Sequence, residues 1–275
     1  MPSSTPAAAP MTEPELGEFS THTRVGDHVV KRLHSHHPAG ARFLDAVARN
    51  GVPGLRSYLG DLQRAEVALP GELTVLDAEP LTIWHRWVPG PTLLTVASSH
   101  AARFTSSIVQ IGQWVERLKD ADARIDANLA NFCLTSGGPV LIDVLPPLIP
   151  SMRPEPRNLF EELFAALCFD TPTTLDALAG YALRVSLRTA GLAAAADLAQ
   201  RTRDMARNEK DSTFPARWFG ARRALATRAA RGETDTDIVH EFFALTSVLR
   251  FRQLTERGRH AQIDYVEQRM QELEL

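Results

Sequence analysis

Three stretches before residue 90 alternate apolar and polar residues with the period of two that β-strands show. They are THTRVGDHVVKRL at 21–33, ELTVLD at 72–77 and LTIWHRWV at 81–88. Between the first two, the segment 38–50 repeats apolar residues every 3.6 positions and is followed by Gly51, which predicts a helix that ends there. Residues 15–90 therefore predict a small α+β lobe, preceded by a disordered Pro/Ala-rich tail at 1–14.

After residue 90 the pattern is mainly helical. The segment 98–120 places five apolar residues on one helix face, with Ser98 or Ser99 as its N-cap. Two short strands, NFCLT and PVLIDV, flank the hairpin signal Ser136-Gly137-Gly138, and helical periodicity then continues from Pro154 to the end of the chain. Residues 91–275 predict a larger helical lobe that contains a loop and a hairpin. The predicted fold class is α+β with two lobes.

Composition narrows the class of protein. A chain of 275 residues with 44% hydrophobic content can bury a substantial core, and a net charge of −3 argues against a surface committed to nucleic acid or to an anionic membrane. No apolar run reaches the roughly 18 residues that a membrane span needs. The two cysteines have neither metal nor disulfide spacing, which favours a cytoplasmic location.

The segment 201–231 is locally basic, with nine Lys/Arg against three acids and three interleaved aromatic residues. We interpret it as the solvated side of helices whose aromatic residues face the core. Binding of RNA or of an acidic peptide is the alternative.

Candidate chemistry lies in the stretch 126–148. A hairpin brings together the residues before its first strand and those at the end of its second, so Asp126, Asn131 and Asp143 are expected to converge. Such oxygen ligands suit Mg²⁺ that bridges phosphates, and a carboxylate left free of metal can accept a hydroxyl proton. The alternative is that Asp126 and Asn131 cap turns and Asp143 ends a strand. That alternative fits Asp143 less well, because a charge after a buried run is costly without compensation.

The spacing Asp-x4-Asn followed by an apolar strand that ends in Ile-Asp resembles the catalytic segment of aminoglycoside phosphotransferases and related small-molecule kinases. The resemblance extends upstream over about residues 16–150. The stretch 16–33 resembles a nucleotide-covering loop followed by a strand with a phosphate-binding lysine, and IWHRWVPGPTL resembles the linker between lobes that holds adenine.

This resemblance implies a protein-kinase-like fold that binds ATP and Mg²⁺ between its lobes and phosphorylates a hydroxyl group of a small molecule or peptide. It implies that Asp126 is the catalytic carboxylate and that Asn131 and Asp143 hold the metal ion. The implied nucleotide-binding residues are Lys31, then Ser20 and Thr21 on the turn between the first two strands, and Trp87 and Val88 beside the adenine.

Some positions depart from the family pattern. Arg124-Ile125-Asp126 stands where the family has His-Gly-Asp, and the only acid on the helix 38–50 that could pair with Lys31 is Asp45. These departures favour an alternative function, a non-catalytic kinase-like module that holds a nucleotide or a partner protein. For an enzyme, the acids at 155, 161, 162 and 170 suggest a cationic acceptor.

Overall fold

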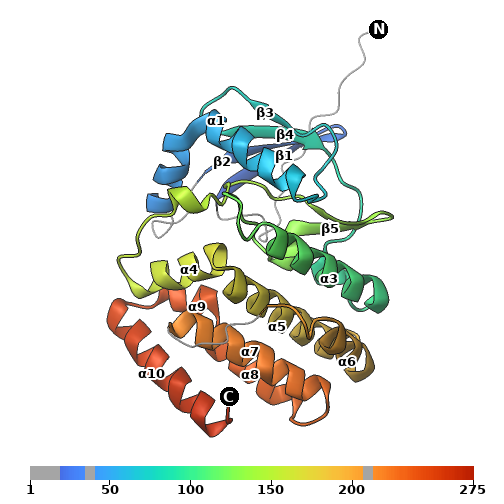
Figure 1. Cartoon of the computed structure of the whole chain (residues 1–275), viewed down its shortest axis with the longest axis vertical. Helices are drawn as coiled ribbons and strands as arrows, with labels where there is room; N and C mark the ends of the chain where they lie inside the picture. The colour runs from blue at the N-terminus through green and yellow to red at the C-terminus, as the bar shows by residue number, and fades with distance from the viewer. Residues whose placement is uncertain (1–18, 35–40, 207–212) are drawn as a thin grey trace.

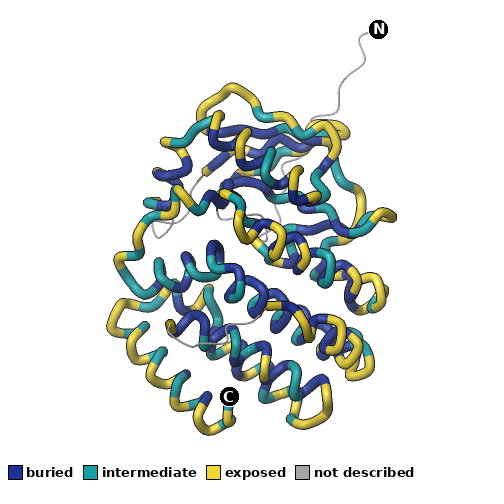
Figure 2. Tube along the Cα trace, in the orientation of Figure 1, coloured by how far each residue is buried: buried dark blue, intermediate teal, exposed yellow. Residues whose placement is uncertain are grey.

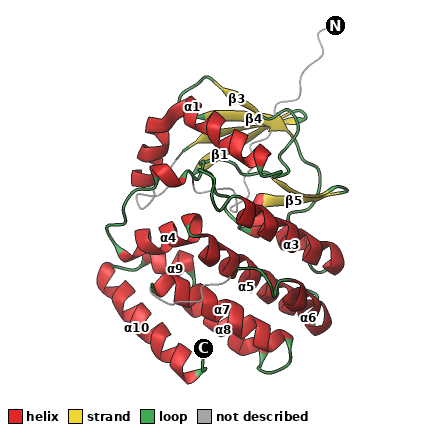
Figure 3. Ribbon diagram, viewed as in Figure 1, coloured by secondary structure: helices red, strands yellow, loops and turns green. Residues whose placement is uncertain are grey.

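The computed structural model describes residues 19–34, 41–206 and 213–275, and it combines a small antiparallel sheet with a larger helical part (Figure 1; Figure 3). The predicted α+β class is confirmed, whereas a kinase-like fold stays a prediction. The predicted tail at 1–14 and residues 16–18 of the expected nucleotide-covering loop lie outside the described residues. Within the described ranges, every helix is too short or too polar to cross a lipid bilayer.

The four-stranded sheet uses all three stretches that alternate in the sequence. Its antiparallel strands, in spatial order, are β1 (Ser20–Val25), β2 (His28–Leu33), β4 (Thr82–Arg86) and β3 (Thr74–Leu76). In the register, Lys31 lies opposite His22 on one side and Ile83 on the other. Because side chains alternate between the faces of a strand, Lys31 shares one face with Ser20, His22, Val29, Leu33, Ile83 and His85.

Helix α1 (Ala41–Arg64) packs beside this sheet and is interrupted at Gly51. The backbone of Gly51 has φ 57° and ψ −157°, a conformation that glycine adopts without steric cost. The first segment therefore ends where the sequence predicts. Pro53 then starts a second helical segment that the periodicity did not predict, since proline is tolerated in a first helical turn. This second segment buries Tyr58 and Leu62.

A linker leads from β4 into α2 (Leu93–Val96) and α3 (Ala101–Arg117). The N-cap of α3 is His100, so the prediction of Ser98 or Ser99 is wrong; both serines lie in the turn that follows α2. The linker lies against the predicted hairpin of β5 (Phe132–Thr135) and β6 (Gly138–Leu141). Gly90 has φ 140°, and a Cβ there would come within 2.5 Å of the Leu134 carbonyl oxygen. This close approach ties the linker to the hairpin.

The rest of the chain is helical, as predicted, and its buried sides face one another (Figure 2). In the segment 201–231, the aromatic residues Phe214, Trp218 and Phe219 are buried, which supports the interpretation that they face the core. The helices are α4 (Leu159–Phe169), α5 (Thr171–Thr189), α6 (Leu192–Arg201), α7 (Phe214–Ala230), α8 (Thr236–Leu245), α9 (Val248–Gln253) and α10 (Glu256–Glu272).

Candidate functional site

Lys31 and Asp143 meet at the junction between the sheet and the hairpin. The ammonium group of Lys31 donates to Asp143 Oδ1 at 3.1 Å and to the carbonyl oxygen of Ile142 at 2.5 Å. The Lys31 side chain is 4% exposed and that of Asp143 is 15% exposed, so this ion pair is largely shielded from water. An edge lysine in solvent is therefore excluded, and the unknown partner of Lys31 is Asp143 rather than an acid on α1.

The loop before β5 carries the other two predicted residues. Asp126 Oδ1 accepts a hydrogen bond from the backbone N–H of Asn128 at 3.0 Å, and the Asn131 amide donates to the backbone oxygen of Asp126 at 3.4 Å. The backbone N–H of Ile142 donates to the Asn131 carbonyl at 2.8 Å, which joins this loop to the strand end before Asp143. Asp126 thus has the turn-capping contact that the alternative interpretation requires, and it also lies within electrostatic reach of Asp143, as the chemical interpretation requires.

The two aspartates influence each other electrostatically. Asp126 retains solvent exposure, yet the surrounding protein desolvates its carboxyl, and this desolvation raises its pKa. The negative charge of Asp143 raises the pKa of Asp126 further, while hydrogen bonds from Asn128 and Asn131 oppose the rise. Of the four residues central to the prediction, Lys31 and Asp143 are in direct contact, and Asp126 and Asn131 lie in the adjoining loop.

Two histidines flank Lys31 on its face of the sheet. Burial, followed by the positive charge of Lys31, lowers the pKa of His22 to about 4. Burial also lowers the pKa of His85 to about 4, against an opposing hydrogen bond between its Nδ1 and the Arg86 carbonyl. Both rings are consequently neutral near pH 7, so neither adds a positive charge beside Lys31.

The loop that carries Asp126 is supported by Arg124. Its guanidinium donates to five backbone carbonyls, at the end of α3 and at Phe169 at the end of α4. From the other side, the buried hydroxyl of Tyr58 on α1 donates to the Arg124 carbonyl at 2.9 Å. Arg124, which stands where the family pattern has a histidine, therefore supports the loop that carries Asp126. Sequence reasoning missed Tyr58, since a tyrosine on a helix gives no signal of which carbonyl it will reach.

The predicted nucleotide-covering turn is wrong in its position. Ser20 and Thr21 are the first two residues of β1, and the turn between the first two strands is Gly26-Asp27. Ser20 is buried and its hydroxyl is hydrogen-bonded to His22 Nε2 at 2.7 Å, while Thr21 lies on the sheet face opposite to Lys31. The alternation in 21–33 predicts strands at both sides of a turn, but it does not say where the first strand starts.

Trp87 and Val88 directly follow β4, in the linker where the adenine is expected. The backbone N–H of Trp87 donates to the Asp27 carbonyl at 2.6 Å, and the guanidinium of Arg24 lies 4.6 Å from the centre of the Trp87 ring. Trp87 is therefore held against the β1–β2 turn. Among the hydrogen bonds of the described residues, none involves the backbone of Val88.

The donor set for a metal ion is small. Within the part of the chain that the structure describes, no three His, Cys, Asp or Glu side chains group closely enough to hold a metal ion. Asn131 and Asp143 offer one amide oxygen and one carboxylate. That pair fits Mg²⁺, which takes one or two protein carboxylates and completes its shell with water and phosphate oxygens, and does not fit a dedicated all-protein cage.

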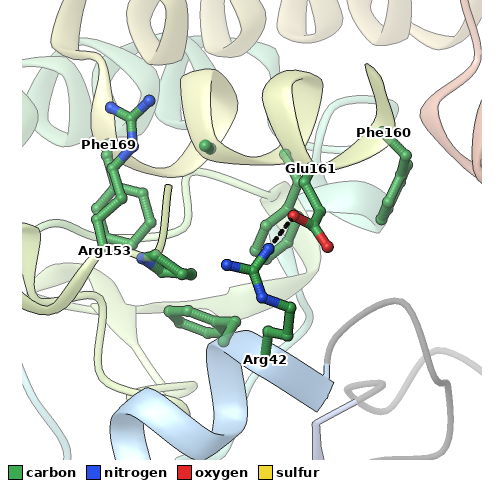
Figure 4. Close-up of a pocket in the computed structure, with 9 residues that line it drawn as sticks. Arg42, Arg153, Phe160, Glu161 and Phe169 are labelled. Carbon is green, nitrogen blue, oxygen red and sulfur yellow. Dashed lines mark hydrogen bonds and ion pairs between the residues drawn. The ribbon is translucent and has the colours of Figure 1, made fainter. Parts of the chain in front are cut away.

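Two cavities lie elsewhere in the molecule. One, of about 20 Å³, has room for a single water between α1 and α4, beside the ion pair of Arg42 and Glu161 at 2.5 Å (Figure 4). The other, of about 370 Å³, lies along α7 beside Arg223 and Arg228. Neither is lined by the four central residues, so a triphosphate pocket beside Lys31 stays a prediction.

Comparison of the chain with models of known protein families and with curated proteins finds no match.

Proposed function

We propose that this chain is an ATP- and Mg²⁺-dependent phosphotransferase that acts on a hydroxyl group of a small molecule or peptide. The resemblance to aminoglycoside phosphotransferases suggests this activity. The observation that carries it is the contact of Lys31 Nζ with Asp143 Oδ1 at 3.1 Å, between residues 112 positions apart in the sequence. It supports the proposal because a phosphate-binding cation and a metal-binding carboxylate need to face the same triphosphate.

In the proposed reaction, Lys31 binds phosphate oxygens, and the backbone around Val88 receives the base. The acceptor hydroxyl oxygen forms a bond to the γ-phosphorus, the bond from that phosphorus to the ADP oxygen breaks, and the hydroxyl proton passes to the Asp126 carboxylate. A raised pKa makes Asp126 a better proton acceptor as long as it is ionised at the working pH. Asn131 and Asp143 would hold Mg²⁺, which when bound neutralises phosphate charge.

The acceptor is left as a broad class because two acids expected to line its site have structural partners. Glu161 accepts hydrogen bonds from Arg42 and from the backbone N–H of Arg157. Asp170 caps the N-terminus of α5 through the Thr173 N–H. A cationic acceptor held by these carboxylates would have to displace those contacts, so the acids give no special support to an aminoglycoside.

A second candidate is a nucleotide-binding module without transfer activity. Within the described residues, α1 contributes no carboxylate at ion-pair distance from Lys31, and the lysine pairs instead with the proposed metal ligand. Without a carboxylate on α1 to orient it, Lys31 is less well positioned for phosphoryl transfer, which favours binding over turnover.

The test combines the thermal shift by MgATP with an assay of ATP turnover. For the phosphotransferase, MgATP should raise Tm of the wild type, Asp143→Asn should lose the shift, and Asp126→Asn should keep the shift but lose turnover. Asp45→Asn, which changes an exposed acid on α1, is the matched control and should behave as wild type. Absence of a shift in the wild type, or a shift unchanged in Asp143→Asn, would refute the site. A shift with no turnover in the wild type would favour the binding module.

A further inference from the structure

Four basic side chains gather in the helical part, outside the site around Lys31. Arg184 and Arg188 come from α5, Arg222 from α7 and His240 from α8. These three helices pack against one another (Figure 1). The guanidinium carbons of Arg184 and Arg222 lie 5.2 and 4.5 Å from the centre of the same ring, that of Phe243.

The arginines of this cluster have no ion-pair partner in the described part of the chain. Across residues 19–34, 41–206 and 213–275, none of the three arginines forms an ion pair. Arg184 Nε and His240 Nδ1 are buried and find no hydrogen-bond partner among the residues that the structure describes. By contrast, the neighbouring Arg223 is paired with Asp176 at 2.9 Å. Arg222 donates to neutral acceptors, to Thr246 Oγ1 at 2.8 Å and to the Phe243 carbonyl at 3.3 Å. Among the described residues, the α5–α7–α8 interface therefore holds one arginine paired with a carboxylate and, beside it, arginines whose charge no carboxylate pairs.

The pKa values of Arg222 and His240 reflect the electrostatic cost of this arrangement. Burial, and then the charge of Arg184, lowers the pKa of Arg222 to about 9, with Tyr181 opposing. Burial, Arg184 and Arg188 lower the pKa of His240, with Asp237 opposing. Like charges held together in a desolvated place repel, and a bound anion would relieve that repulsion.

We propose that Arg184, Arg188, Arg222 and His240 form a binding site for a phosphate-bearing anion between α5, α7 and α8. Guanidinium groups match phosphate oxygens in pairs, and several cations suit a multiply charged anion better than a single carboxylate. His240, neutral near pH 7, can still donate one ring N–H. Arg184, Arg222 and His240 are half-buried and Arg188 is exposed, so solvent reaches the cluster. The site does not depend on the proposed phosphotransferase activity.

The experiment measures Tm in inorganic phosphate, acetate and chloride at one ionic strength. Phosphate at about fivefold excess over its Kd should raise Tm by roughly 2–4 °C, acetate should raise it less, and chloride should not. Arg184→Met should abolish the phosphate shift without lowering Tm in chloride, because it removes repulsion on Arg222. Arg64→Met, which removes an exposed arginine paired with Asp61, is the control and should keep the full shift.

Equal shifts in phosphate and chloride, or a phosphate shift that survives Arg184→Met, would overturn the proposal. In Lys31→Met, phosphate should still raise Tm relative to the Tm of that variant without phosphate. Loss of the phosphate shift in this variant would place the anion at the site around Lys31 instead. Should Arg184→Met not fold, Arg188→Met tests the same point, because Arg188 is exposed. In that variant the phosphate Kd from calorimetry should rise by roughly two- to fivefold. An unchanged Kd would contradict the assignment.

Discussion

Replacement of Arg124 by methionine is expected to remove the hydrogen bonds that support the loop carrying Asp126, and so to destabilise the protein. The guanidinium donates to the carbonyls of residues 118, 119, 121 and 123 at 2.6–2.8 Å and to that of residue 169 at 3.3 Å. The carbonyls of residues 118 and 119 directly follow α3. At a helix C-terminus the last carbonyls have no partner within the helix, and they favour a nearby cation. Methionine keeps much of the side-chain volume and removes all five donors.

The magnitude follows from what happens to those carbonyls. A carbonyl left buried without a donor costs about 1–3 kcal/mol, whereas one that water can reach costs much less. The Leu118 carbonyl keeps a second donor, the backbone N–H of Ala121. Arg124 is itself half-buried, so about half of the other four acceptors should be rehydrated. Arg124→Met should then destabilise the protein by about 2–6 kcal/mol. Arg124→Lys keeps the charge, but the three N–H donors of lysine sit on a single nitrogen, so this variant should lose about 1–3 kcal/mol of stability.

Urea unfolding followed by circular dichroism gives both values from the midpoints, provided the m-value is unchanged. Arg117→Met is the control, because Arg117 is the last residue of α3 and forms an exposed ion pair with Glu66. It should cost less than about 1 kcal/mol. A loss below about 1 kcal/mol for Arg124→Met, or a loss no larger than that of the control, would refute the role of Arg124.

Three other changes have defined outcomes. Gly90→Ala should lower the free energy of unfolding, measured in urea, by about 2–4 kcal/mol, because Gly90 has φ 140° and the added Cβ would lie 2.5 Å from the Leu134 carbonyl oxygen. Gly71→Ala is the control and should be close to neutral, because an added Cβ there meets open space. Asp126→Asn should raise Tm at pH 7, because the folded state raises the pKa of Asp126 and so disfavours its ionised form. The gain in Tm should disappear as the pH falls below 3.8, where the carboxyl is protonated in both the folded and the unfolded state. A lower Tm of the variant at pH 7 would contradict this. Tyr58→Phe should lower stability by about 1–3 kcal/mol, because it removes the hydroxyl that donates to the carbonyl of the half-buried Arg124. Equal midpoints for variant and wild type would show that the bond contributes nothing.

The sequence by itself determined most of the strands and helices, although the second segment of α1 and the start of β1 were not predicted. Alternation identified the strands at 74–76 and 82–86, and the Ser136-Gly137-Gly138 signal identified the hairpin between residues 132 and 141. These features depend on local backbone preferences and on side-chain periodicity, which neighbouring residues fix. The hairpin also predicted the approach of Asn131 to the strand end before Asp143, because a two-stranded turn closes that distance on its own.

Only the tertiary structure decided which partners meet across long separations. Lys31 was expected to need an acid from α1, but the fold gives it Asp143 and the carbonyl of Ile142. Arg124 takes the place of a supporting histidine in the sequence pattern, and it binds four carbonyls of the turn just before it and one distant carbonyl, that of Phe169 at the end of α4. The basic cluster around Phe243 likewise exists only because three helices pack together. Such contacts depend on the packing of distant segments, and no local pattern in the chain encodes their distance or direction.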